Sequence, residues 1–145
     1  MPGVLVGIYC GTEKGKGKFL NEQAELVPEH GIRGDAHAGG KPSRQLSLFA
    51  SEVFESIVAE GIDFSMSDLS ANLITRGIDL DFLDVGIRLE VGNCLIEITE
   101  SRKPCGALTR IDLRLPRATY TRCGKFARVI TGGSVHIGEP VRILG

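Results

Sequence analysis

The sequence predicts a mostly β protein, an antiparallel barrel with two or three short helices. Short apolar segments recur along the chain at close spacing, as they do in proteins built from many short strands. Glycine is abundant, with 19 residues against two tyrosines and no tryptophan, and it supplies the tight turns that such strands need. The strand segments do not alternate with helical ones, an alternation that would indicate a parallel sheet.

Nine apolar segments have the length of a β-strand and are bounded by turn-forming residues. In chain order they are residues 4–10, 24–27, 45–49, 72–75, 87–91, 94–99, 126–130, 134–137 and 141–144. Two neighbouring pairs are joined by Gly92-Asn93 and by Gly132-Gly133. These residues tolerate the positive φ of a two-residue turn, so we expect an antiparallel hairpin at each.

One segment carries apolar side chains at helical spacing instead. Residues 51–60 predict an amphipathic helix, with Ser51 as its N-cap and Gly61 just after its end. A second, shorter helix is expected to begin near Cys105. Between residues 113 and 120 the pattern is less regular, and Pro116 is expected to interrupt it.

The composition limits what the chain can do. A length of 145 residues is typical of one domain, so we expect a single domain over residues 1–145. The net charge of −1 provides no basic field over the whole molecule for nucleic acid or a membrane surface. No apolar run approaches the ~20 residues that span a bilayer, and the first residues lack a signal-peptide pattern. We therefore expect a cytoplasmic protein.

The four cysteines are widely spaced and form no CxxC pair. This spacing argues against a zinc ribbon, and four cysteines are weak grounds for a disulfide framework in a chain of this length. Free thiols in a reducing compartment fit the pattern better. The glycine- and lysine-rich residues 11–18 predict a loop after the first strand.

The tetrad Lys103-Pro104-Cys105-Gly106 follows the strand predicted over residues 94–99. Pro104 ends the strand because proline has no N–H to donate. Arg102 and Lys103 precede the cysteine, and cations and a helix N-terminus both stabilise a thiolate. Cys105 is therefore a candidate nucleophile or metal ligand. The alternative is a buried cysteine that packs as a small apolar side chain.

A second cluster lies in residues 31–40, where four glycines accompany Arg33, Asp35 and His37. Asp35 could orient His37 or accept a hydrogen bond from an N–H-rich ring; alternatively it caps the amides of a structural turn. Arg44 lies at the start of a strand, where it could hold an anion bidentately or simply face solvent. Since the chain is nearly neutral, an anionic ligand must be met by such local cations. The glycine pattern matches neither a dinucleotide fingerprint nor a P-loop.

Several blocks, in this order along the chain, resemble the MOSC domain, named for the C-terminal part of molybdenum cofactor sulfurases. Their order makes the resemblance more specific than any single block, and they cover nearly the whole chain. The blocks are Gly34-Asp35-Ala36-His37-Ala38-Gly39, Arg44-Gln45-Leu46-Ser47-Leu48, Asn72-Leu73, Arg102-Lys103-Pro104-Cys105, and Gly124-Lys125-Phe126-Ala127-Arg128-Val129 with Gly138-Glu139.

The resemblance implies a barrel related to that of the pyruvate kinase barrel domain and binding of the pyranopterin molybdenum cofactor. It implies that Cys105 is the catalytic residue, as the molybdenum ligand or as a sulfur carrier. The cofactor-binding residues expected with it are Arg33, Asp35, His37, Arg44, Asn72, Arg102 and Lys103. Nothing resembles a pyridoxal-phosphate domain, so pyridoxal phosphate is not expected.

Two active functions stay open on the sequence. In the first, molybdenum held through Cys105 reduces a small substrate, an N-hydroxylated base or related compound. The chain has no cluster-type cysteine spacing for a relay of its own, so a separate electron donor protein is required. In the second, Cys105 carries a persulfide, or the domain handles the cofactor, without turnover. A third possibility is that only the fold is shared and Cys105 is buried and inert.

Two blocks depart from the family pattern. Ser70-Ala71 stands where relatives commonly have Gly-Glu before Asn-Leu, and Phe126 stands where they commonly have tyrosine. The chain therefore lacks an acidic group and a hydroxyl near the expected pocket. These changes bear on substrate handling rather than on the fold.

Overall fold

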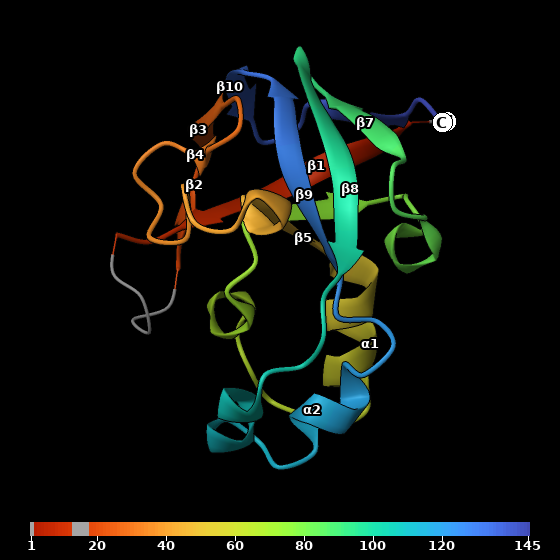
Figure 1. Cartoon of the computed structure of the whole chain (residues 1–145). Coiled ribbons are helices and arrows are strands. Elements are labelled where there is room, and N and C mark those ends of the chain that lie inside the picture. The colour runs from red at the N-terminus through yellow and green to blue at the C-terminus, as the bar shows by residue number, and fades with distance from the viewer. Residues whose placement is uncertain (1, 13–17) are drawn as a thin grey trace.

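The computed structural model describes residues 2–12 and 18–145, and in these residues strands form a barrel with helices at one end (Figure 1). The loop predicted over residues 11–18 falls largely on residues 13–17, which lie outside the described residues. The strands are β1 (Gly3–Cys10), β2 (Phe19–Asn21), β3 (Gln23–Val27), β4 (Gly31–Ile32), β5 (Leu46–Ala50), β6 (Leu73–Arg76), β7 (Arg88–Val91), β8 (Cys94–Ser101), β9 (Lys125–Thr131), β10 (Gly133–His136) and β11 (Pro140–Ile143).

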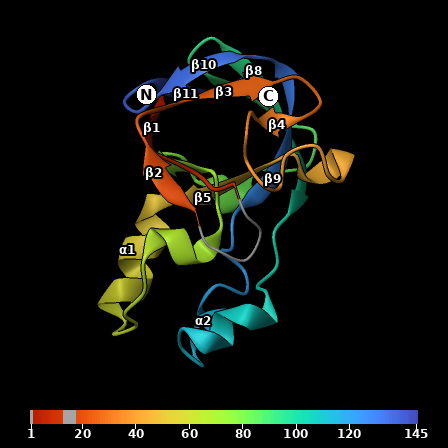
Figure 2. The ribbon, with the colours of Figure 1, turned by 90° about the vertical axis from the view of Figure 1, so that its left-hand side faces the viewer.

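Seven of these strands close into a ring, which Figure 2 shows above the helices. The order around the ring is β11-β7-β8-β9-β5-β6-β1, and pairing of β1 with β11 closes it. All neighbours run antiparallel except β5 and β6, which are parallel. The mostly β barrel that the sequence predicts is therefore confirmed. β2 extends the sheet beyond β1, and its three residues were too few for the sequence to predict.

The parallel pair is joined by helix α1 (Ser51–Ala59), so the barrel contains one strand-helix-strand unit that we did not expect. All five residues of β5 are buried, because the strand is covered on both faces. Ala50, and not Ser51, occupies the N-cap position of α1. Gly61 follows the helix with a φ of 95°, as the sequence indicates.

The two predicted hairpins have different outcomes. Gly92-Asn93 does connect β7 to β8, with Val91 opposite Cys94. The prediction at Gly132-Gly133 was wrong, because β10 leaves the barrel after this turn and pairs with β3 in a second sheet of order β10-β3-β4. Gly132 permits the crossing, since a Cβ there would lie 2.4 Å from the carbonyl oxygen of Leu26.

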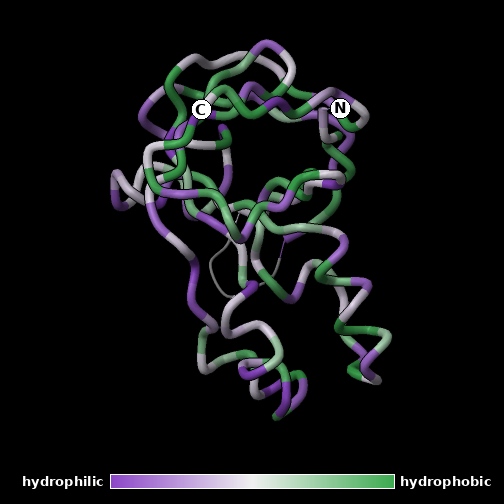
Figure 3. Tube along the Cα trace, turned by 90° about the vertical axis from the view of Figure 1, so that its right-hand side faces the viewer, coloured by the Kyte–Doolittle hydropathy of each residue, from purple (hydrophilic) through white to green (hydrophobic). Residues whose placement is uncertain are grey.

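Two hydrophobic cores lie on the two sides of the parallel pair. Hydrophobic positions recur along the barrel strands in Figure 3, and the interior is filled by side chains such as Leu48 and Leu73. Their neighbours Phe49 and Ile74 point the other way, into a second core with Ile57 of α1. The period-two alternation of the two strands thus attaches the helical end to the barrel.

Short helices complete the helical end and the entrance to β5. Their bounds are η1 (Pro42–Arg44), η2 (Met66–Leu69), η3 (Leu80–Phe82), η4 (Gly106–Arg110) and α2 (Leu115–Ala118). Cys105 is the N-cap of η4, close to the predicted helix start. Pro116 does not interrupt its segment as predicted; it lies in the first turn of α2, where a missing N–H costs no helical hydrogen bond.

None of the helices among the described residues is both long enough and apolar enough to cross a membrane.

Candidate functional site

Two neighbouring cavities share the side chain of Arg102. The first, here the His37 cavity, has a volume of about 270 Å³, and the second, the Cys123 cavity, about 360 Å³. The His37 cavity is lined by His37, Gly40, Lys41, Arg44, Ser47, Ser70, Asn72, Arg102 and Phe126. The Cys123 cavity is lined by Asp81, Ser101, Arg102, Lys103, Tyr120, Thr121, Cys123, Gly124 and Lys125.

Arg102 follows the end of β8 and its guanidinium is poorly compensated. Nη2 donates to the carbonyl oxygen of Leu69 at 2.7 Å, whereas the buried Nη1 has no hydrogen-bond partner among the described residues. The guanidinium carbon lies 5.6 Å from the centre of the Phe126 ring. Burial lowers the pKa of Arg102, although charge on Cys123 acts in the opposite direction. A buried cation with an idle donor indicates a place for an anion.

Arg44 reaches the same cavity from η1. It forms a two-pronged ion pair with Glu100, at 3.1 and 3.2 Å, and it also lies over the Phe126 ring at 5.0 Å. The hydrogen bond to Glu100 and the charge of that carboxylate raise the pKa of Arg44. The sequence indicated an anion-holding arginine here but not Glu100, which lies 56 residues further along the chain.

Asn72 lines the His37 cavity, but its side chain already connects three strands. Its Oδ1 accepts hydrogen bonds from the backbone N–H and the hydroxyl of Ser47, at 3.0 and 3.1 Å, and its Nδ2 donates to the carbonyl oxygen of Tyr9. The side chain therefore joins β1, β5 and the start of β6. Asn72 thus has a structural role in joining these strands, in addition to the cofactor-binding role expected from the sequence.

Asp35 is buried behind His37 and lines neither cavity. It accepts hydrogen bonds from the Lys18 ammonium at 2.6 Å and from the backbone N–H groups of Gly11 and His37, at 3.0 and 3.2 Å. Burial raises its pKa, but these hydrogen bonds and the Lys18 charge outweigh burial, so the pKa is lowered overall. Asp35 thus caps the amides of a turn, one of the two roles that the sequence left open.

Lys18 also explains how His37 is held. Its Nζ lies 3.0 Å from Nδ1 of His37, so the ammonium serves both neighbours. Since an ammonium only donates, Nδ1 is the accepting nitrogen and the proton of the neutral ring is on Nε2. The sequence did not indicate Lys18, which it placed in the charge run of a loop.

The remaining predicted cofactor ligands lie elsewhere. Arg33 is exposed and pairs with Glu25 on β3, so it belongs to neither cavity. Lys103 is exposed and lines the Cys123 cavity instead of the His37 cavity. Of the predicted set, the structure brings His37, Arg44, Asn72 and Arg102 around one cavity.

Cys105 lies at the surface, at the N-terminus of η4, and lines neither cavity. Its sulfur accepts a hydrogen bond from the backbone N–H of Ala107 at 3.4 Å. All four thiols are free, and Cys105 alone is exposed. Burial raises the pKa values of Cys94 and Cys123, and with the charge of Asp35 it raises that of Cys10. Cys105 is therefore the thiol that an external molecule can reach.

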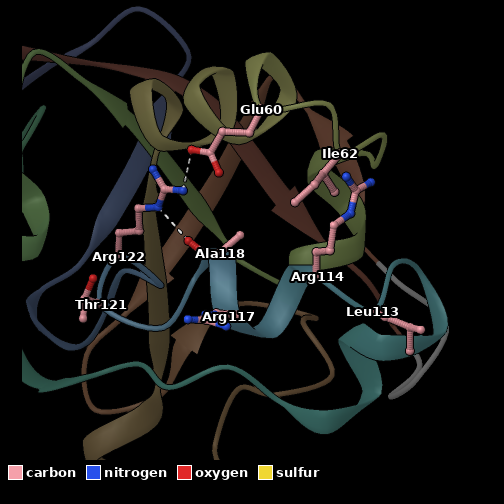
Figure 4. A pocket seen from close by; sticks show the side chains of 8 residues that line it. All are labelled: Glu60, Ile62, Leu113, Arg114, Arg117, Ala118, Thr121 and Arg122. Atoms are coloured by element: carbon pink, nitrogen blue, oxygen red, sulfur yellow. Dashed lines mark hydrogen bonds and ion pairs between the residues drawn. The ribbon is translucent and has the colours of Figure 1, made fainter.

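A third, larger cavity of about 710 Å³ separates α2 from the end of α1 (Figure 4). Arg122 crosses it to Glu60 at 2.8 Å and to the carbonyl oxygen of Ala118 at 2.6 Å, as Figure 4 shows. Arg114 pairs with Asp112 and donates to the carbonyl oxygen of Gly61. These arginines hold the two helices together, so this cavity is less suited to an anion than the two that share Arg102.

Within the described part of the chain, no three His, Cys, Asp or Glu side chains gather as a metal-binding cluster. Lys125 is a functional candidate that sequence reasoning did not single out. It is a buried lysine at the first position of β9, directly before the apolar residues Phe126 and Ala127, and this position was the available signal.

The profile of the MOSC domain matches residues 35–142. The YuaD protein of Bacillus subtilis has a similar structure, with 20% identity and a TM-score of 0.83 over 97% of this chain and 94% of that protein. YiiM from Geobacillus stearothermophilus is 20% identical, with a TM-score of 0.81 over 99% of this chain and 76% of that protein. YiiM from Escherichia coli is 21% identical, with a TM-score of 0.73 over 100% of this chain and 70% of that protein. At these identities the likeness establishes the fold. No curated protein matches the chain.

Proposed function

This chain belongs to the MOSC domain family, and on that premise we propose that its His37 cavity binds the molybdenum cofactor. The observation that carries the proposal is Arg102, whose buried Nη1 has no partner among the described residues. The pyranopterin cofactor bears a phosphate, and an anion beside this guanidinium would satisfy both its charge and its idle donor.

The other residues of the cavity suit an anionic, ring-containing ligand. Lys41, His37 and Arg44 add donors at the rim, and Glu100 is engaged by Arg44 and by Ser43. Because the described residues offer no metal-binding cluster, the metal would arrive with the cofactor. Cys105 is the proposed protein ligand of the metal, since a soft thiolate suits it. Its exposed sulfur lies outside the lining of the His37 cavity, so the metal-bearing end of the cofactor would extend beyond that cavity.

In the proposed mechanism each side chain has a defined task. Arg102 binds the phosphate, and Glu100 orients Arg44 while raising its pKa. The Ala107 N–H stabilises negative charge on the sulfur of Cys105. His37 holds a proton on Nε2 near the cavity mouth. The bound cofactor would supply the two-electron chemistry that no side chain provides.

The proposed substrate is an N-hydroxylated base or a related compound. Its reduction breaks the N–O bond, consumes two electrons and two protons, and releases water and the base. The electrons must come from a separate donor protein, because the cysteines lack the spacing of an iron–sulfur site. We place the reaction in the cytoplasm, where the four free thiols would stay reduced.

The exposure of Cys105 favours a second candidate, a sulfur carrier. A thiolate at the surface can attack the outer sulfur of a persulfide on a donor protein, so that the donor's S–S bond breaks and its own thiolate leaves. Cys105 then carries the persulfide and presents its outer sulfur to an acceptor. This function needs no substrate turnover and no electron donor. The sulfur-carrier function requires the thiol of Cys105, as cofactor binding does, but it does not require Arg102.

Metal and sulfur analysis distinguishes the two candidates. Protein would be produced in a host that makes the cofactor, as wild type, Arg102→Gln, Cys105→Ser and the control Arg33→Gln. We expect molybdenum near one atom per chain in wild type and Arg33→Gln, and loss of most of it in the other two. Persulfide on Cys105 without molybdenum would instead support the sulfur carrier. Equal molybdenum in Arg102→Gln and wild type would contradict the proposed cavity.

A further inference from the structure

The charge of the Cys123 cavity is not balanced by the residues that line it. Lys125 points from β9 into this cavity and is only 7% exposed. Its Nζ donates to the hydroxyl of Ser101 at 2.8 Å, and no carboxylate among the described residues is within ion-pair distance. An ammonium has three protons to donate, so a neutral hydroxyl alone leaves it poorly compensated.

Two further cations line the same cavity. Arg102 lines this cavity as well as the His37 cavity, and Lys103 stands exposed at its edge without a carboxylate partner among the described residues. Neutral donors are present as well, from Ser101, Thr121 and Tyr120. Three positively charged side chains and several hydroxyl groups therefore line this one cavity.

Asp81 is the acidic residue of this cavity, and it does not neutralise these cations. Its Oδ1 accepts the backbone N–H of Gly124 at 2.9 Å, and it forms no ion pair with Lys125 or Arg102. Burial raises the pKa of Asp81 despite the Gly124 N–H and the charge of Lys125. Even when Asp81 is ionised, its single negative charge is outnumbered by Lys125, Arg102 and Lys103, so the cavity stays positive.

We propose that the Cys123 cavity is a second anion site, which binds a phosphate group, either free or at the end of a larger molecule. Lys125, Arg102 and Lys103 supply charge, and the hydroxyls supply neutral donors to the remaining oxygens. A doubly charged oxyanion matches two buried cations better than a carboxylate does. The site rests on Lys125 and Lys103, which the His37 cavity does not contain. It shares Arg102 with that cavity, so Lys125→Met and Lys41→Gln are the variants that distinguish the two sites.

Titration calorimetry on protein made without the cofactor tests this site. Sodium phosphate and phenyl phosphate would be titrated at constant ionic strength into wild type, Lys125→Met, Lys103→Gln and the control Lys41→Gln. We expect saturable binding in wild type and Lys41→Gln, weakened about tenfold or more in Lys125→Met. Binding of inorganic phosphate would identify a free anion as sufficient, and binding of phenyl phosphate alone would identify a larger ligand.

Two further readouts keep the test decisive. The Lys125→Met variant removes an uncompensated buried charge, so it should melt no lower than wild type in chloride. In ¹⁵N-labelled wild type, phosphate should shift the amide of Gly124 and leave that of Gly40 in place. The proposal is overturned if neither ligand binds, if Lys125→Met binds as wild type does, or if Lys41→Gln alone loses binding. The last result would place the anion in the His37 cavity.

Discussion

The four cysteine thiols of this chain differ most in how far their side chains are exposed to solvent. Cys105 is exposed beside a backbone N–H, whereas Cys94 is fully buried in the barrel core. Burial keeps Cys94 and Cys123 protonated to higher pH than an ordinary thiol, because their pKa values are raised. Only the thiolate attacks an alkylating reagent.

Iodoacetamide at pH 8 should therefore label Cys105 before the other three cysteines. Peptide mass spectrometry over a time course gives the order directly. Raising the pH should bring in Cys10 next, since it is partly exposed but has a raised pKa. Earlier labelling of Cys94 would show that the barrel opens readily, whereas earlier labelling of Cys123 would show that the reagent enters the Cys123 cavity.

Serine substitutions of Cys105 and Cys94 distinguish a reactive thiol from one that only packs in the core. Cys105→Ser changes an exposed atom, so the free energy of unfolding should stay close to that of wild type. Cys94→Ser places a hydroxyl in the barrel core and should cost about 1–3 kcal/mol if that hydroxyl finds no partner. Urea denaturation of both variants measures the difference. A destabilised Cys105→Ser protein that keeps its molybdenum would defeat the assignment of Cys105.

Asp35 and Lys18 form an ion pair in which both side chains are almost completely buried. Asp35→Asn would leave the ammonium without its counter-charge, and we expect a loss of roughly 3 kcal/mol in the free energy of unfolding. Chemical denaturation measures it. The matched control is Glu25→Gln, which breaks the exposed pair with Arg33 and should change stability little. Equal effects of the two substitutions would contradict this account.

Among the structural elements, β1, β5 and β6 depend on one buried amide. Asn72→Ala would leave the backbone N–H of Ser47 and the carbonyl oxygen of Tyr9 without their present partner. We expect a cost of about 1–3 kcal/mol in unfolding free energy, in protein prepared without any cofactor. Thermal and urea denaturation both report it. If Asn72→Ala were as stable as wild type but failed to retain molybdenum, Asn72 would be a ligand-binding residue only.

The elements that the sequence predicted well are those with a strong local signal. Residues 94–99 alternate regularly and form the first six residues of β8, whereas β4 has two residues and no period to detect. Gly132-Gly133 was misread because flexible glycines permit a change of sheet as readily as a hairpin. The parallel contact of β5 with β6 depends on packing of both faces, which periodicity does not reveal.

Local chain signals singled out Arg102 and Arg44, which the structure brings to one cavity, and Cys105, which lies outside it. They did not indicate the partners of the two arginines. Glu100 and Lys18 reach the site from distant segments, so only the fold brings them to Arg44 and Asp35. Arg33 looked equivalent to Arg44 in the sequence, yet the pairing of β3 with β4 directs it to Glu25. The sequence therefore indicates which cations are candidates for the site, but not which of them the fold brings together.

The pH dependence of stability should be dome-shaped for the molecule as a whole. Asp35 and Glu100 have lowered pKa values in the fold, so their stabilisation is present above the ordinary values of 3.8 and 4.5 and is lost as the pH falls further. The buried thiols have raised pKa values, so their contribution is complete below the ordinary value of 9.0 and is lost above it. Thermal melts from pH 3 to pH 10 would test both limbs. The Asp35→Asn variant should show a shallower acid limb than wild type.

The pairing of β1 with β11 has a consequence for how this chain reaches its fold in the cell. Gly3 lies opposite Val141, so the ring cannot close until the last strand has left the ribosome. Until then the edges of β1 and β7 that β11 will occupy are unpaired and open to other chains. Closure of the ring is therefore a late, long-range step of folding, which waits for β11 to be synthesised. During synthesis, these two strand edges are thus the part of the barrel most open to pairing with another chain.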